Sequence, residues 1–131
     1  MRISDFCIVD KPTPLDVIDK IEEFHLQPLR MVNACADFNV FVSANSGYRP
    51  RAYELSKGRK GNSQHCFYGK GAVDVTCEDF KENKDKLLEV LIEETEYTRF
   101  AIYNTFIHVD YAHQVENRWV FNSRWERIRE V

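Results

Sequence analysis

The sequence has little that would place it in or across a membrane. Its first residues, Met-Arg-Ile-Ser-Asp-Phe, lack the apolar stretch of a signal peptide. No apolar run elsewhere approaches the roughly 20 residues that a membrane-spanning helix needs. We therefore expect a chain that is made in the cytoplasm.

The sequence also lacks any Cys-x-x-Cys pair. Its cysteines, Cys7, Cys35, Cys66 and Cys77, are scattered along the chain. The spacing typical of structural zinc fingers and of thioredoxin-like redox sites is therefore missing. We expect reduced thiols, with a disulfide between Cys66 and Cys77 left open as an alternative.

Blocks of like charge, internal repeats and low-complexity segments are missing as well. This disfavours a nucleic-acid-binding arm or a membrane-surface helix. The arginines near the C-terminus alternate with glutamates, which predicts a solvated face for the tail. With 131 residues, a net charge of −3 and 44% apolar residues, the sequence predicts one compact domain over residues 1–131.

Helical patterns occur in the first third and again near residue 80. Apolar residues at helical spacing predict a helix over residues 15–24, and Pro28 suits the first turn of a second helix that ends near Asp37. Asp79 and Glu82 form a potential capping box for a third helix that continues to Ile92. The sequence thus predicts two tandem helices and one separate helix.

Strand patterns fill most of the remaining chain. Residues 39–45 and 72–76 are rich in β-branched side chains, residues 98–111 predict a hairpin that turns at Asn104 and Thr105, and residues 118–121 predict a further strand. Strands that follow one another without helices favour antiparallel pairing. We predict an α+β fold, with a small, mainly antiparallel sheet and helices packed on one side.

A long loop separates the first two predicted strands. It runs from about Ser46 to Lys70 and contains every glycine of the chain except Gly71. A loop of this length in a compact domain is usually functional.

Three residues in and after this loop have the character of zinc ligands. His65 lies near the end of the loop, Asp74 lies on the predicted strand behind it, and His108 lies on a later predicted strand. A catalytic zinc takes three protein ligands from histidine and carboxylate side chains and keeps a fourth position for water. The sequence therefore predicts a mononuclear zinc site at His65, Asp74 and His108.

The motifs around these residues resemble a known family. Ser-Gly-Tyr-Arg ends at Arg49, Ser-Gln-His ends at His65, Gly-Ala-Val-Asp ends at Asp74, and a strand then carries His108. In this order they resemble the signature of zinc peptidases that include D-alanyl-D-alanine carboxypeptidases, phage L-alanyl-D-glutamate endopeptidases and the hedgehog signalling domain. The resemblance covers roughly residues 28–112.

The resemblance implies a hedgehog-like or D-Ala-D-Ala peptidase-like fold, a Zn²⁺ cofactor and peptidoglycan stem peptides as substrate. It implies that His65, Asp74 and His108 bind the zinc and that Arg49 binds the carbonyl or carboxylate of the substrate. It also implies a phage-encoded or bacterial cell-wall enzyme that is released to the wall. A planar, permanently charged guanidinium suits the role of Arg49, since it can stabilise an oxyanion or hold a carboxylate.

The chain departs from the family pattern at two points. His65 and Asp74 are nine positions apart instead of seven, and no acid or histidine lies shortly before His108, where the family carries its general base. Asp110 shares a strand face with His108, so it is predicted either as the base or as a residue that orients His108. His113 and Glu116 remain alternatives.

Two functions follow from the sequence. The first is a zinc-dependent peptidase that hydrolyses a peptide bond in peptidoglycan, with no nucleic-acid partner. The second is a zinc-containing binding or structural module that keeps the fold and has lost hydrolysis, which the missing acid before His108 favours.

Overall fold

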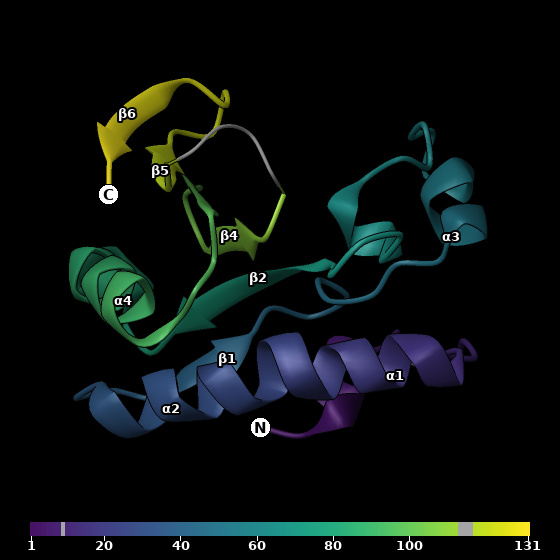
Figure 1. Cartoon of the computed structure of the whole chain (residues 1–131), viewed down its shortest axis with the longest axis horizontal. Helices are drawn as coiled ribbons and strands as arrows, with labels where there is room; N and C mark the ends of the chain where they lie inside the picture. The colour runs from purple at the N-terminus through teal and green to yellow at the C-terminus, as the bar shows by residue number, and fades with distance from the viewer. Residues whose placement is uncertain (9, 113–116) are drawn as a thin grey trace.

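The computed structural model of the chain describes residues 1–8, 10–112 and 117–131, and has an α+β architecture (Figure 1). Its helices are η1 (Ile3–Phe6), α1 (Leu15–Ile21), η2 (Glu22–Leu26), α2 (Gln27–Cys35), α3 (Arg51–Ser56), η3 (Gln64–Cys66) and α4 (Phe80–Glu94). Its strands are β1 (Val40–Val42), β2 (Ala72–Cys77), β3 (Arg99–Ile102), β4 (Ile107–Asp110), β5 (Trp119–Phe121) and β6 (Arg127–Glu130). The predicted α+β class is confirmed.

The strands form one six-stranded sheet in the order β1-β2-β4-β3-β5-β6. All neighbouring pairs are antiparallel except β3 and β5, which run parallel. The predicted hairpin is confirmed as β3 and β4, and its turn is closed by the Tyr103 amide, which donates to the Phe106 carbonyl at 2.9 Å. Strand β6 was not predicted, because its four residues are all exposed and show no apolar alternation.

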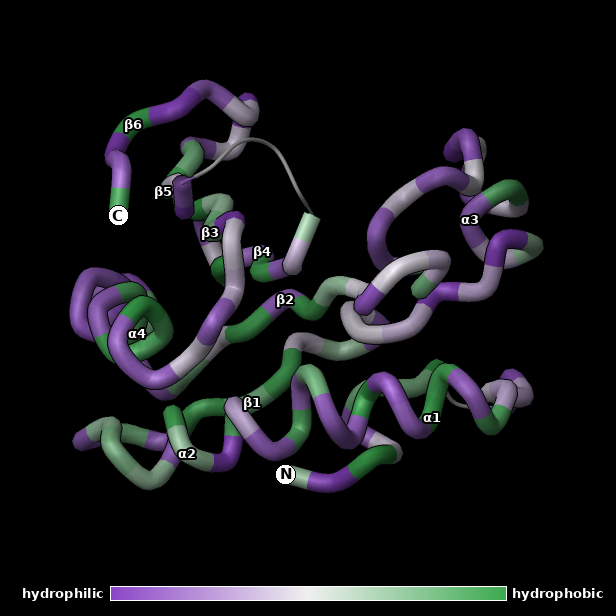
Figure 2. Tube along the Cα trace, in the orientation of Figure 1, coloured by the Kyte–Doolittle hydropathy of each residue, from purple (hydrophilic) through white to green (hydrophobic). Residues whose placement is uncertain are grey.

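The two faces of the central strands differ in chemistry. On one face, Val73 and Val75 of β2 and Val109 of β4 join buried residues of α1, α2 and α4 in a single hydrophobic cluster. Figure 2 shows β1 and β2 as mostly hydrophobic and β6 as mostly hydrophilic. Because side chains alternate along a strand, Asp74 and His108 lie on the opposite face. The long helices thus cover one face, and the other is free to carry a polar site.

The second of the two predicted tandem helices is confirmed as α2, which has Pro28 in its first turn, and the structure adds that the two helices follow each other through η2 without a break. The π-helical η2 joins α1 to α2, with the Gln27 amide donating to the Glu22 carbonyl. Pro28 has no N–H to give to the Phe24 carbonyl. The Tyr111 hydroxyl donates to that carbonyl instead, at 2.6 Å, so the helix continues without a break.

The predicted capping box of α4 is wrong. The N-cap residue Asp79 has a left-handed backbone (φ 49°) and its side chain makes no capping hydrogen bond. The Asn83 side chain donates to the Glu78 carbonyl at 2.9 Å. The helix is held mainly by Leu87, Leu88 and Leu91, which are buried in the core.

The predicted long loop between β1 and β2 contains the short helices α3 and η3. All four cysteines are free thiols, so the alternative disulfide between Cys66 and Cys77 does not form. Within the described ranges, no helix combines the length and the apolar character that a membrane crossing requires.

Candidate metal centre

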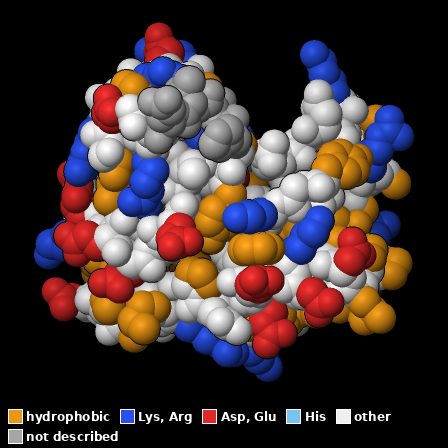
Figure 3. All heavy atoms as spheres, in the orientation of Figure 1, with side chains coloured by type: hydrophobic (Ala, Val, Ile, Leu, Met, Phe, Trp, Pro, Cys, Tyr) orange, Lys and Arg blue, Asp and Glu red, His pale blue; other side chains and the backbone are white. Residues whose placement is uncertain are grey.

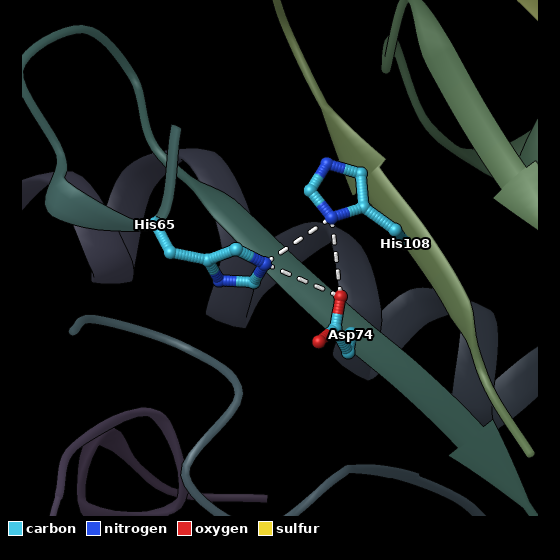
Figure 4. Close-up of side chains that lie close together, drawn as sticks. All are labelled: His65, Asp74 and His108. Atoms are coloured by element: carbon cyan, nitrogen blue, oxygen red, sulfur yellow. Dashed lines mark hydrogen bonds and ion pairs between the residues drawn. The ribbon is translucent and has the colours of Figure 1, made fainter. Parts of the chain in front are cut away.

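Three side chains from separate elements converge on the polar face of the sheet (Figure 4). His65 lies in η3, whose first turn is fixed by the Ser63 hydroxyl, which accepts a hydrogen bond from the His65 amide at 3.1 Å. Asp74 of β2 and His108 of β4 are directly opposite each other in the antiparallel register. Sheet pairing therefore fixes two of the three side chains, and the η3 turn brings in the third.

The three ligand atoms form a nearly equilateral triangle. His65 Nε2 lies 3.2 Å from His108 Nδ1 and 3.3 Å from Asp74 Oδ1, and His108 Nδ1 lies 3.2 Å from Asp74 Oδ1. Tetrahedral zinc with ligand bonds of about 2.0–2.1 Å separates its ligand atoms by about 3.3–3.4 Å. The triangle thus has nearly the size that three zinc ligands require.

The outer hydrogen bonds of the two imidazoles determine what faces the centre of this triangle. His65 Nδ1 lies 2.9 Å from the Gly47 carbonyl, and His108 Nε2 lies 2.8 Å from Asp110 Oδ2. Both outer partners are acceptors, so each outer nitrogen carries a proton, and when a ring is neutral its lone pair faces inward. Two imidazole lone pairs and a carboxylate oxygen then face one another, an arrangement that a cation stabilises.

The pKa shifts agree with a carboxylate that stays ionised. Burial alone would raise the pKa of Asp74, but the two imidazoles beside it hold that pKa well below its usual range. Burial lowers the pKa of His65. Burial would also lower the pKa of His108, but hydrogen bonds to Asp110 and Asp74 outweigh it, so that pKa is raised. The cluster therefore attracts positive charge.

Asp110 lies on the far side of the His108 ring from Asp74. It is fully buried, and its carboxylate accepts hydrogen bonds from Arg99 Nε at 2.8 Å, Arg99 Nη2 at 2.6 Å and the Ala112 amide at 2.9 Å, besides the bond to His108. Such a carboxylate fixes the tautomer and the orientation of a ligand histidine. Of the two roles predicted for Asp110, this geometry favours the orienting one.

Arg49 lines the cavity in front of the ligand triangle. The cavity measures about 260 Å³ and is also lined by Ser63, Tyr103, Phe106 and Trp125. Arg49 Nε has no hydrogen-bond partner among the described residues and lies 3.7 Å from the buried carboxylate of Glu54 in α3. The predicted position of Arg49 beside the metal residues therefore agrees with the structure, and α3 supplies a counter-charge that the sequence did not suggest.

The aromatic wall of this cavity was not predicted. Tyr103 and Phe106 stack with ring centroids 4.7 Å apart, and Trp125 packs edge-on against the His108 ring at 5.1 Å. Trp125 has a left-handed backbone (φ 61°) and donates from Nε1 to the Tyr103 hydroxyl at 2.9 Å. Tyr103 and Phe106 flank the predicted turn, which was a usable signal. Trp125 lies in the tail that the sequence predicted as solvated, and nothing local marked it.

The remaining histidines and acidic residues do not join the ligand triangle. His25 lies outside the metal site, fully buried in the core, where its ring nitrogens hydrogen-bond the Tyr97 hydroxyl and the Lys70 carbonyl. His113 and Glu116, the alternative bases, lie outside the described residues. Of the described residues that line the metal cavity, none is acidic except Asp74 itself.

Comparisons of the chain with protein-family models, with curated proteins and with solved structures find no match.

Proposed function

We propose that the protein is a zinc-dependent peptidase that hydrolyses a peptide bond in peptidoglycan stem peptides. The observation that carries the proposal is the triangle formed by His65 Nε2, Asp74 Oδ1 and His108 Nδ1, with edges of 3.2–3.3 Å. Its ligand set of two imidazoles and a carboxylate matches that of catalytic zinc sites that keep an open position. The resemblance of the surrounding motifs to zinc cell-wall peptidases supports the substrate class and a hedgehog-like or D-Ala-D-Ala peptidase-like fold.

The chain's own residues can perform the accompanying steps. A zinc ion held by His65, Asp74 and His108 would supply Lewis-acid polarisation of a carbonyl and an acidified water. Asp110 keeps the His108 ring in its ligand orientation. Arg49 presents N–H donors at the cavity wall, where a carbonyl oxygen gains negative charge during attack. Tyr103, Phe106 and Trp125 shield the cavity from water on one side.

The test combines metal analysis with digestion of peptidoglycan. We expect one zinc per chain in protein purified without chelators, release of peptide fragments from purified peptidoglycan, and loss of both in His65→Ala, Asp74→Asn and His108→Ala. Asp79→Asn is the matched control for Asp74→Asn, because Asp79 is exposed and asparagine tolerates its left-handed backbone. Protein that retains no zinc after such a purification contradicts the proposal.

A second candidate is a zinc-containing module without hydrolytic activity. The observation that favours it is the lack of a free carboxylate among the described residues of the metal cavity, since hydrolysis needs a proton acceptor. Stoichiometric zinc together with intact peptidoglycan would support this module and remove the peptidase.

A further inference from the structure

Arg99 of β3 lies between the candidate metal centre and the aromatic wall of the metal cavity. It is directly opposite Asp110 in the antiparallel register of β3 and β4, so its side chain lies on the same face of the sheet as that of His108. Only 15% of the Arg99 side chain is exposed, and Asp110 is fully buried. The pairing of the two strands therefore holds a mostly buried cation next to the carboxylate that orients His108.

The first contact of the Arg99 guanidinium is with this carboxylate. Arg99 Nε donates to Asp110 Oδ1 at 2.8 Å, and Arg99 Nη2 donates to Asp110 Oδ2 at 2.6 Å. Oδ2 is also the atom that accepts the hydrogen bond from His108 Nε2, at 2.8 Å. Two parallel hydrogen bonds fix the rotation of a carboxylate, which a single point charge does not. Arg99 thereby sets the direction from which Asp110 meets the His108 ring.

The second contact of the guanidinium is with Trp125, in the turn between β5 and β6. Arg99 Cζ lies 4.5 Å from the centroid of the Trp125 ring, and the same ring packs edge-on against His108 with centroids 5.1 Å apart. A planar guanidinium can stack on an indole while its edge donates to a carboxylate. Arg99 therefore contacts both groups that touch the His108 ring from outside the ligand triangle.

Trp125 also shapes the cavity in front of the ligand triangle. The cavity is lined by Trp125 on one side and by Arg49, which precedes α3, on another. In the space-filling view the surface is hollowed between the part that carries β5 and β6 and the part that carries α3 (Figure 3). By holding Trp125, Arg99 supports one wall of the metal cavity.

We infer that Arg99 is a positioning residue of the metal centre: it fixes Asp110 and Trp125 together, and through them the orientation of His108 and the shape of the cavity. The inference rests on the metal site of the proposed function and does not require hydrolysis. It also specifies what the position needs. A lysine ammonium can replace the charge of Arg99, but it cannot replace the two parallel hydrogen bonds together with the stacking.

Substitution of Co²⁺ for zinc tests this role, because the visible absorption bands of Co²⁺ depend on the arrangement of its ligands. In the cobalt-loaded full chain, Arg99→Lys should shift these bands. The lysine keeps a cation beside the buried Asp110 carboxylate, which protects the fold from an unpaired charge. Arg127→Lys is the matched control, since Arg127 stacks on the other tryptophan, Trp119, at 4.6 Å. It should leave the bands unchanged.

Zinc affinity, measured by competition with a chromophoric chelator, shows whether Arg99 acts through Asp110. We expect Arg99→Lys to weaken zinc binding by about three- to tenfold, less than the loss of roughly 10- to 100-fold that is usual for a direct partner of a ligand. In the Asp110→Asn background the same change should cost less than in the wild type, because the carboxylate that Arg99 positions is already absent.

A second variant tests the contact with the indole. Trp125→Phe leaves the pair of Arg99 and Asp110 in place and removes part of the stacking surface. It should therefore shift the cobalt bands by less than Arg99→Lys does. Bands that stay unchanged in Trp125→Phe would contradict the part of the inference that concerns the cavity wall.

Cobalt bands and zinc affinity that Arg99→Lys leaves unchanged, changes that Arg127→Lys reproduces, or fully additive losses in the double variant would each overturn the inference. These outcomes are separate from those of the proposed function. A wild type that binds zinc and leaves peptidoglycan intact would keep the role of Arg99 and remove the peptidase. A wild type that binds neither zinc nor Co²⁺ would remove both.

Discussion

At the scale of single residues, Asp74 and Asp110 differ in the side of the His108 ring that each one meets. Asp74 lies 3.2 Å from Nδ1, which faces the ligand triangle, and Asp110 lies 2.8 Å from Nε2, which faces away from it. Hydrogen bonds from His108 and Arg99 outweigh the effect of burial and lower the pKa of Asp110 to about 2. A group that holds its proton so weakly is suited to orient a histidine and is a poor proton acceptor near neutral pH.

We predict that Asp110→Asn weakens zinc binding by about 10- to 100-fold, the usual effect of removing the partner that orients a ligand histidine. Competition with a chromophoric chelator measures the dissociation constant. Asp79→Asn, an exposed change of the same kind, should leave it unchanged. Unaltered zinc affinity in Asp110→Asn combined with lost turnover would contradict the orienting role and would support the base.

His25 gives a second prediction at this scale, which concerns pH. Burial is the largest cause that lowers its pKa from 6.5 to about 4 in the folded chain. Between these values the unfolded chain binds the proton and the folded chain does not, so stability is fully present above about pH 6.5 and declines as the pH falls toward 4. The full shift corresponds to about 3 kcal/mol.

Urea unfolding between pH 7.5 and pH 4.5 measures this contribution as the difference between the wild type and His25→Gln. The variant keeps an amide that can serve Tyr97 and Lys70 but cannot titrate, so its stability should depend less on pH. His65 and His108 are present in both proteins, so most of their contribution cancels in the comparison. Parallel pH dependences of the two proteins would contradict the prediction.

The candidate site could be predicted from the sequence only where short motifs marked it. His65, Asp74 and His108 lie in ordered motifs with a chemistry that suits zinc, and the structure brings them together. Trp125 was not found because its contact with His108 depends on how the β5–β6 turn folds back across β4. Sequence patterns are local, and they carry no information about such a contact.

At the scale of elements, strong periodicity predicted most of the helices and strands, whereas contacts with distant groups decide how these elements join. The hairpin of β3 and β4 follows from alternating apolar residues and a turn-prone pair. The continuity of η2 with α2 depends on Tyr111, whose hydroxyl serves the carbonyl that Pro28 leaves free. A proline inside a helix usually ends or kinks it. Nothing in the sequence around Pro28 indicates that a hydrogen-bond donor 87 residues away will bond the Phe24 carbonyl.

The parallel pairing of β3 with β5 has a similar origin. Strands that follow one another in the sequence predicted a mainly antiparallel sheet, and only the pairing of β3 with β5 departs from this pattern, because β4 occupies one edge of β3 and β5 pairs at the other edge. The segment between β4 and β5 connects them, and this choice of edge makes β5 parallel to β3. The edge at which a strand pairs depends on which other strands have already joined the sheet. The sequence therefore predicted residues 118–121 as a strand but not its position in the sheet.

At the scale of the whole molecule, the hydrophobic core and the candidate metal site lie on opposite faces of the sheet. The helices bury the apolar face, and the opposite face carries three potential ligand atoms close enough together to hold a metal ion. Because the unfolded chain does not bring these atoms together, zinc should bind the folded state far better than the unfolded state. Zinc binding should therefore appear as added stability of the entire domain.

We predict that zinc raises the melting temperature by about 10 °C at a free concentration 100 times its dissociation constant. This corresponds to about 2.7 kcal/mol of linkage and to about 3–4 °C per kcal/mol for a domain of this size. Differential scanning calorimetry with and without chelator measures the shift. Magnesium, which prefers an octahedral set of oxygen ligands, should produce almost none. His108→Ala should abolish the zinc-dependent shift whatever its own melting temperature, because the remaining two ligands no longer enclose the ion. A shift that persists in this variant would locate the zinc elsewhere in the chain.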